Sequence, residues 1–276
     1  MSSTTRHPDR PRLAEAVLAA SILPGSQLYT SVRVVEQTGS TNADLLAAAR
    51  SGAAAGAVLA AEEQTAGRGR LDRNWQSEPG ASLLFSVLLR PDAVPAGSWS
   101  WLPLLAGVAT VSALRAQTGV DVRLKWPNDV LARAADGDRK LAGILAEQGG
   151  DAVVVGIGLN VSATEAELPH RQASSLWLAG ADNPDRQVIL IALLGELERW
   201  YLRWSDGRNP GDADACGLRE AYLRSCATVG REVRVETPGG GILAGRAGDV
   251  DHVGRLLVTA ADGVHAISAG DVIHVR

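Results

Sequence analysis

The sequence contains few cysteine, histidine or aromatic residues. Its only cysteines are Cys216 and Cys226, which are too few for a disulfide framework and too far apart for a Cys-x-x-Cys metal clip. The 5 histidines show no spacing typical of metal ligands. We therefore predict no structural metal site, and we expect thiols that stay reduced in the cytoplasm.

A surplus of basic residues is also missing. The chain has 27 lysines and arginines against 31 aspartates and glutamates, which gives a net charge of −4. Because sequence-independent binding to nucleic acid requires a surplus of cations to neutralise phosphates, we expect no nucleic-acid partner. The polar start of the chain lacks the apolar core of a secretion signal, and we expect no apolar run of the roughly 18 residues that cross a membrane.

What is present is the composition of a globular protein. Apolar residues make up 46% of the 276 residues, enough for one large core and a small second module. We predict an N-terminal extension with a short helix over residues 1–30, a main α+β domain over residues 31–227, and an all-β module over residues 228–276. Short strands, the glycine-rich turn Pro238-Gly239-Gly240-Gly241 and the hairpin signal Asp262-Gly263 mark that last module.

Hydrophobic spacing predicts strands and helices along the first two regions. The predicted strands cover residues 32–35, 58–61, 83–89, 122–126, 141–147 and 152–161. The predicted helices cover residues 13–22, a segment that Thr41 starts as part of a capping box and Gly52 ends, residues 101–115 closed by Gly119, and a segment from Asn183-Pro184 to about Gly207. Because the last three of these strands, over residues 122–126, 141–147 and 152–161, are short and follow one another, we expect antiparallel pairing among them.

The polar stretch Gln64–Gly80 is longer than a connection between two strands needs. It contains Gly67-Arg68-Gly69-Arg70, where glycines leave backbone N–H groups open and two guanidinium groups can grip phosphate or carboxylate. Taken alone, this motif fits a solvated surface turn equally well. It lacks the Lys-Ser or Lys-Thr of a Walker A loop and the βαβ context of a dinucleotide-binding turn, so we exclude both classes.

A second motif, Lys125-Trp126-Pro127-Asn128-Asp129, follows a predicted strand. Its proline, asparagine and aspartate suit a plain turn. The same five residues also supply a cation, a stacking face, a hydrogen-bond donor and acceptor, and a possible proton acceptor.

Five blocks occur in an order and spacing that resemble the biotin protein ligases. They are Ser40-Thr41-Asn42, the Gly67–Arg70 motif with Arg73 and Trp75, Lys125–Asp129, Lys140–Leu145, and Gly156–Val161. The resemblance extends from about Val32 to the end of the chain. Each block alone is modest, but agreement of all five by chance is very improbable.

The resemblance implies a catalytic domain like that of class II synthetases, with a mixed, largely antiparallel sheet and flanking helices, followed by an SH3-like β-barrel. It implies a ligase that joins biotin to ATP with Mg²⁺ and transfers the biotinyl group from biotinyl-5′-AMP to one lysine of a biotin carboxyl carrier protein. Larger bifunctional members carry an N-terminal helix-turn-helix domain for which residues 1–30 leave no room. We therefore expect no repressor role, and a monomer or weak homodimer.

The same resemblance implies the residues of the site. For biotin it indicates Ser40, Thr41, Asn42, Gln64, Gly67, Arg68, Arg70, Lys140 and Gly143. For ATP and the adenylate it indicates Arg70, Arg73, Trp75, Lys125, Asn128, Lys140 and Asn160. Catalytic roles are expected for Lys140, Arg70 and Asp129. Simpler structural roles stay open for some of them, since Thr41 can cap its helix, Trp75 can merely pack and Lys140 can be solvated.

Two carboxylates, Asp129 and Asp72, lie in the sequence close to the expected binding residues. An acceptor lysine has an ordinary pKa of about 10.4, and a lone carboxylate beside it raises that pKa, so we expect Asp129 to orient the amine more than to deprotonate it. Asp72 departs from the family, in which many members have glycine at this place, and a carboxylate among phosphate-binding arginines can weaken the loop.

Two alternative functions remain at this stage. A lipoate ligase shares the adenylation chemistry and a related fold, although the arginine loop and the Lys125–Asp129 block resemble the biotin enzymes more closely. A non-enzymatic module that binds anions is the other alternative, and the acidic net charge disfavours it when the anion is nucleic acid.

Overall fold

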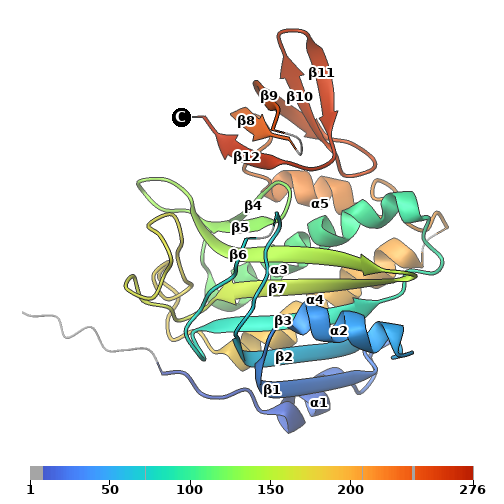
Figure 1. Cartoon of the computed structure of the whole chain (residues 1–276), viewed down its shortest axis with the longest axis vertical. Coiled ribbons are helices and arrows are strands. Elements are labelled where there is room, and N and C mark those ends of the chain that lie inside the picture. Colours follow the sequence, from blue (N-terminus) through green and yellow to red (C-terminus); the bar gives the residue numbers. More distant parts are fainter. Residues whose placement is uncertain (1–8, 72, 207, 238–239, 276) are drawn as a thin grey trace, which may run out of the picture.

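The computed structural model describes residues 9–71, 73–206, 208–237 and 240–275. Within them a large sheet is covered by helices on both faces, and a smaller sheet is placed against its upper end (Figure 1). The helices are α1 (Glu15–Ile22), α2 (Thr41–Arg50), η1 (Ala96–Trp101), α3 (Leu102–Thr118), α4 (Arg186–Ser205) and α5 (Leu218–Ser225). The strands are β1 (Ser31–Thr38), β2 (Ala57–Gln64), β3 (Ser82–Leu89), β4 (Val122–Lys125), β5 (Asp129–Ala132), β6 (Arg139–Gly149), β7 (Ala152–Asn160), β8 (Glu232–Glu236), β9 (Ile242–Val250), β10 (Leu256–Ala260), β11 (Gly263–Ile267) and β12 (Asp271–His274).

The large sheet has the strand order β1-β2-β3-β7-β6-β5-β4. Its strands pair antiparallel except β1 and β2, which are parallel. The antiparallel pairing expected over residues 122–161 is confirmed in β4 to β7, whereas β1 and β2 at the far edge run parallel. The reason is that α2 crosses from the end of β1 back to the start of β2, and such a crossover makes its two strands parallel. The predicted fold class, a mixed and largely antiparallel sheet with flanking helices, is confirmed.

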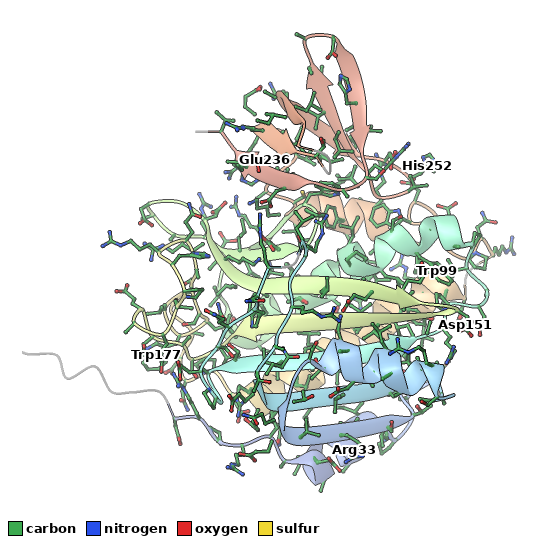
Figure 2. The ribbon with its side chains drawn as sticks, viewed as in Figure 1. Arg33, Trp99, Asp151, Trp177, Glu236 and His252 are labelled. Atoms are coloured by element: carbon green, nitrogen blue, oxygen red, sulfur yellow. The ribbon has the colours of Figure 1, made fainter. Side chains whose placement is uncertain are left out.

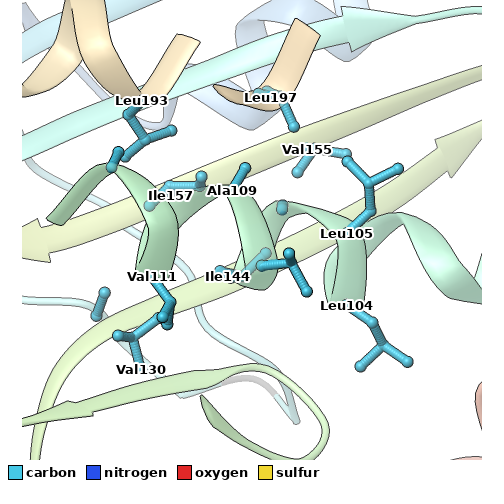
Figure 3. Packing of buried hydrophobic residues seen from close by; sticks show 14 of the residues in the cluster. Leu104, Leu105, Ala109, Val111, Val130, Ile144, Val155, Ile157, Leu193 and Leu197 are labelled. Carbon is cyan, nitrogen blue, oxygen red and sulfur yellow. The ribbon is translucent and has the colours of Figure 1, made fainter. Parts of the chain in front are cut away.

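The core lies on the face of the large sheet that α3 and α4 cover. Every residue of β3 is buried, as are most residues of α3. Figure 3 shows this layer with side chains of α3, the sheet and α4 packed together: Leu104, Leu105, Ala109, Val111, Val130, Ile144, Val155, Ile157, Leu193 and Leu197. Val154, one residue from Val155, belongs to a smaller cluster under α2, because neighbouring residues of a strand point to opposite faces.

The apolar segment Ala96–Thr118 corrects one expectation. It is long and apolar enough to cross a membrane by length and composition, although the sequence analysis expected no such run. Of its most apolar window, 67% is buried inside the protein. It is therefore a core helix whose apolar surface is covered by the sheet and by α4.

Helix starts and short elements also differ from the expectations. Ser40 caps α2 and Thr41 is its first residue, whereas Asp185, not Asn183, caps α4 by accepting from the N–H groups of Gln187 and Val188. Asn183 has a positive φ of 41°, which ends any helix there. Strand β5 and helix α5 were not predicted. Gly119 closes α3 in the left-handed conformation as expected.

The small sheet has the strand order β11-β10-β9-β8-β12, with every pair antiparallel. The hairpin predicted at Asp262-Gly263 joins β10 to β11. The other predicted turn, Pro238–Gly241, lies partly outside the described residues. Two indole N–H groups of the larger unit donate to the small one, Trp101 to His252 O at 2.8 Å and Trp126 to Gly254 O at 3.0 Å. Figure 2 labels His252 at this junction.

Candidate functional site

A cavity of about 890 Å³ opens between the sheet, the arginine loop and β12. It is lined by nearly all the residues that the sequence analysis singled out: Ser40, Thr41, Asn42, Gln64, Arg68, Arg70, Arg73, Trp75, Lys125, Asn128, Asp129, Lys140, Gly143 and Asn160. Gly67 is the one predicted residue that is not among the lining residues. Segments from across the chain thus meet at one place.

The arginine loop is a narrow hairpin and not an irregular coil. Arg68 and Asn74 form an antiparallel bridge, the Trp75 N–H donates to Gly67 O at 2.9 Å, and Gly69 N–H donates to Arg73 O at 2.6 Å. A Cβ at Gly67 would lie 2.6 Å from the Trp75 carbonyl oxygen, so this position requires glycine. Gly67 therefore acts by closing the hairpin. The predicted effect of Asp72 falls on a residue outside the described ones.

Each arginine of this hairpin has a polar partner. Arg68 forms an ion pair with Glu147 at 3.1 Å, and Arg70 Nη1 donates to Asn128 Oδ1 at 3.3 Å. Burial lowers the pKa of Arg70, against the opposing effect of Asp129 nearby. The guanidinium is thus charged but poorly hydrated, and a poorly hydrated cation attracts an anionic ligand more strongly than a surface arginine does.

The third arginine connects the hairpin to the small sheet. Arg73 forms a bidentate ion pair with Asp271 at the start of β12. Burial alone would raise the pKa of Asp271, but this pair together with Lys125 and Arg70 lowers it. Asp271 was not predicted from the sequence, because a carboxylate almost 200 positions from Arg73 leaves no local pattern.

Trp75 lies on a floor made of glycines. A Cβ at Gly158 would come within 2.6 Å of the indole, and one at Gly143 within 3.1 Å. The Lys140 ammonium lies 5.8 Å from the centroid of the ring, within the range of a cation–π contact. Gly158 was not predicted, although a glycine inside a strand is a recognised sign of close approach by another group.

Two lysines bring positive charge to the cavity. Lys140 Nζ lies 2.7 Å from Asp129 Oδ1. Burial lowers the pKa of Lys125, while Asp129 and Asp271 act in the opposite direction. Across the whole lining of the cavity, eight lysine and arginine side chains face four aspartates, so the cavity suits a ligand with several negative charges.

The far end of the cavity, around α2 and the end of β2, is polar. Gln64 Oε1 accepts from both the N–H and the hydroxyl of Thr41, at 2.7 and 3.0 Å. Asn42 accepts from Ser86 Oγ at 2.6 Å and donates to Leu145 O at 3.2 Å, so both ends of its amide have protein partners. These bonds hold the side chains of α2 and β2 in fixed orientations.

Asn160 and Lys140 are held by the loop that follows β7. Asn160 Nδ2 donates to Ser174 O at 2.9 Å, and Ser82 Oγ donates to its other amide atom. The Lys140 N–H donates to Gln172 O at 2.7 Å, and Ser174 N–H donates to Lys140 O at 2.8 Å. This loop also lines the cavity through residues 169–173.

A histidine of the small sheet is a further lining residue without a sequence signal. His274 Nε2 lies 3.0 Å from Thr228 Oγ1, and Nδ1 lies 3.4 Å from an Arg231 nitrogen. Burial, reinforced by the positive charges of Lys125 and Arg231, lowers the pKa of His274 to about 4. The imidazole is therefore neutral at pH 7.

Two family descriptions match the chain. The biotin/lipoate A/B protein ligase family matches residues 33–162, and the biotin protein ligase C-terminal domain matches residues 228–275. A biotin–[acetyl-CoA-carboxylase] ligase of Mycobacterium tuberculosis is 43% identical over 99% of this chain and 100% of its own length. A bifunctional ligase/repressor of Bacillus subtilis is 32% identical over 81% of this chain and 68% of its own length.

A solved structure is also similar to most of this chain. The biotin protein ligase of Aquifex aeolicus, in complex with biotin and ATP, superposes with a TM-score of 0.73 and 27% identity. The match covers 90% of this chain and 100% of that one.

Proposed function

Because the chain belongs to the biotin protein ligase family, we propose that its cavity activates biotin with ATP and then biotinylates one lysine of a carboxylase carrier domain. The observation that carries the proposal is the meeting of three buried or half-buried cations, Arg70, Lys125 and Lys140, with the Trp75 indole around one cavity. Such a site matches a ligand that combines a carboxylate, phosphates and a flat base.

In the first half-reaction a carboxylate oxygen of biotin attacks the α-phosphorus of ATP, and pyrophosphate leaves. Negative charge grows on the phosphate oxygens as the new bond forms. Arg70 and Lys140 are the groups that we assign to offset this charge, since preoriented cations lower the barrier most when water is scarce. Lys125, Arg73 and Asn128 are assigned to the phosphates and the nucleotide.

The product of that step is a mixed anhydride, which water hydrolyses. The hairpin over residues 67–75 lies along the cavity, and Arg70 fastens it to Asn128 on the opposite side. We assign this hairpin the task of keeping water out while the adenylate waits for its acceptor. Ser40, Thr41, Gln64 and Arg68 are assigned to the biotin end.

In the second half-reaction the amine of the acceptor lysine attacks the acyl carbon, the bond to AMP breaks, and an amide forms with loss of one proton from the nitrogen. Asp129 is already bound to Lys140 at 2.7 Å. We therefore assign Asp129 two successive tasks: it positions Lys140 for adenylation and then orients the incoming amine.

Mg²⁺ enters this account with ATP as part of the substrate. Across the described residues no group of three or more His, Cys, Asp or Glu side chains is placed to hold a metal ion. The cavity carboxylates Asp129, Asp136, Asp138 and Asp271 are each paired with a basic side chain. We expect the phosphates and water to supply most ligands of the ion, as is usual for Mg²⁺.

The same proposal includes the acceptor protein and the cellular compartment. The partner is the carrier domain of a biotin-dependent carboxylase, and we place the reaction in the cytoplasm, consistent with the two free thiols Cys216 and Cys226. No nucleic-acid partner is proposed, since the net charge is −4.

The proposal is tested by isotope exchange between pyrophosphate and ATP, with Mg²⁺ and with biotin or lipoate as the acid. We expect exchange with biotin and none with lipoate alone. Exchange that depends on lipoate would make the chain a lipoate ligase. Exchange with neither acid would favour a module that only binds anions.

A further inference from the structure

The chain before β1 forms a strap along one edge of the catalytic unit. Pro11 O accepts from Arg186 Nη2 at 2.6 Å, and Leu13 N–H donates to Glu62 Oε1 at 2.7 Å. Glu62 and Arg186 are themselves a buried ion pair at 2.7 Å. This polar segment was expected to be an N-terminal extension, but residues 9–14 are fixed to the main domain by buried charges.

Arg10 reaches from this strap to the loop after β7. Its Nη1 and Nη2 bind the two Glu167 oxygens at 3.0 and 2.6 Å, and its Nε and Nη2 bind Oγ and O of Ser162, both at 3.1 Å. The Arg10 and Glu167 side chains are only 16% and 19% exposed. A bidentate pair with so little access to water holds its geometry better than a surface pair does.

Glu167 connects Arg10 to the rest of the loop. Its Oε2 also accepts from the Thr164 N–H at 2.8 Å and from the Thr164 hydroxyl at 2.9 Å. These bonds hold the pKa of Glu167 at about 2, with Arg10 as the main cause. The carboxylate is therefore ionised, and bound to Arg10, throughout the neutral range.

The same loop carries the backbone groups that hold Lys140 and Asn160. Gln172 O and Ser174 N–H bind the Lys140 backbone, and Ser174 O binds the Asn160 amide. Figure 2 labels Trp177, which follows this segment in the chain. A restraint at Glu167 thus lies a few residues from groups that fix two cavity side chains, although Arg10 itself is not among the lining residues.

We propose that Arg10 is a positioning residue for the nucleotide half of the cavity, acting through Glu167 and the loop over residues 162–175. The inference rests on the proposed function. Without Arg10 the loop shifts, Lys140 and Asn160 lose their fixed places, and ATP binds less well, whereas the biotin end around α2 is untouched.

The test compares Arg10→Ala and Glu167→Gln with Arg12→Ala as the matched control. Arg12 belongs to the same strap, but its ion pair with Glu36 is exposed and lies away from the loop. In biotin-dependent pyrophosphate exchange we expect Arg10→Ala to raise the KM for ATP about tenfold, which is less than the loss caused by a displacement of about 1 Å at reacting groups. The KM for biotin stays within about twofold, and Arg12→Ala matches the wild type.

Three further measurements separate positioning from plain stability. The double variant Arg10→Ala/Glu167→Gln is expected to match Arg10→Ala, because both changes break one pair. Arg10→Lys is expected to recover only part of the affinity for ATP, since an ammonium cannot bind both carboxylate oxygens and Ser162 at once. Amide hydrogen exchange of residues 164–175 is expected to rise in Arg10→Ala and not in Arg12→Ala.

The contrary results are equally specific. If Arg10→Ala has wild-type KM values, or if the KM for biotin rises as much as that for ATP, the positioning role is wrong. Should Arg10→Ala fail to fold, Arg10→Lys and Glu167→Gln decide by the same criteria. A wild-type protein without biotin-dependent exchange overturns the proposed function instead, and unchanged hydrogen exchange of the loop in Arg10→Ala overturns the structural link by itself.

Discussion

Trp75 fits into the cavity because the strand residues under its indole ring are glycines, which have no side chains. The indole lies against Gly158 and Gly143, and any side chain at Gly158 would occupy the space of the ring. Its N–H is buried without a partner among the described residues. An unpaired buried donor costs free energy, and we assign its partner to the bound nucleotide.

The first prediction follows from the packing of the Trp75 indole against Gly158. Gly158→Ala places a Cβ within 2.6 Å of the indole and forces Trp75 to move. Pyrophosphate exchange is expected to fall on the order of 100-fold, as for a misplacement of about 1 Å in an active site. Gly195→Ala is the control, because a Cβ there meets nothing within 4 Å, and it is expected to leave the exchange rate unchanged. Equal activity of both variants would show that Trp75 does not contact the nucleotide.

The second prediction concerns Lys140. Lys140→Ala removes the cation that we assign to the adenylation step and leaves the half-buried Asp129 without its partner. We expect pyrophosphate exchange to fall about 1,000-fold, the scale of losing one preoriented charge in a catalytic site. A wild-type rate of exchange in this variant would remove Lys140 from the site.

The third prediction is a pH effect at His274, whose pKa is about 4 in the folded chain, chiefly because of burial. An unfolded histidine has a pKa of about 6.5, so between these values the unfolded chain binds a proton that the folded chain does not. The free energy of unfolding therefore falls as the pH drops from about 6.5 to about 4, by about 1–2 kcal/mol after allowance for solvent screening.

Urea unfolding at pH 7.5 and pH 4.5 measures this effect. The drop in stability between the two pH values is expected to be smaller for His274→Asn than for the wild type. The exposed His252 serves as control, and His252→Asn should keep the wild-type drop. An identical drop in all three proteins would mean that His274 is not the titrating group.

Among the elements, the hairpin over residues 67–75 is the one to which we assign the retention of the adenylate. Arg70 is its link to Asn128 across the cavity. Lys125 and Lys140 are the only lysines in the sequence. An adenylate that escapes therefore finds few amines on the enzyme itself and reacts with other proteins instead.

The fourth prediction uses this scarcity of lysines. Arg70→Gly is expected to retain part of the exchange activity but to label lysines of a bystander protein, such as serum albumin, several-fold more than the wild type does, because the hairpin no longer closes. Blotting for biotin on the bystander measures the leak, with Arg12→Gly as control. Bystander labelling no greater than that of the control would refute the retaining role of Arg70.

Elements with a long pattern and a clear end were predictable from the sequence. Helix α3 has a full apolar stripe, and Gly119 ends it as expected. Strand β5 was not predictable, because its four residues hold a register shift between Val130 and Leu131 and carry too little periodicity. Pairing partners were also beyond the sequence, since the crossover of α2 that makes β1 and β2 parallel is a property of the whole sheet.

The residues of the cavity, too, were only partly predictable from the sequence. Its predicted residues lie in motifs, where several functional groups within a few positions raise the signal above chance. Asp271 and His274 reach the same cavity from the far end of the chain as single residues in a short strand. Arg10, in a polar segment with two prolines nearby, carries no pattern at all. Only the packing of distant segments reveals such residues.

At the scale of the whole molecule, the two sheets share one core. A single cluster of buried side chains runs from α3 and α4 to Val233, Val250 and Leu256 of the small sheet. The indole bonds of Trp101 and Trp126 cross the same junction. The small sheet thus depends on the larger one for part of its apolar burial.

The fifth prediction is that the described units unfold together. Calorimetry is expected to show one cooperative transition, because separating the sheets would expose their common core. Trp126→Phe, which removes the bond to Gly254 O, is expected to lower the free energy of unfolding by about 1–2 kcal/mol and keep a single transition. Two transitions in the wild type would contradict the common core.

The mass of an isolated carrier domain after incubation with this protein, biotin, ATP and Mg²⁺ shows directly whether the protein is a biotin ligase. We expect a gain of one biotinyl group on one lysine, dependent on ATP and absent when that acceptor lysine is changed to arginine. A carrier domain of unchanged mass, in the presence of a folded enzyme and all three substrates, would contradict it.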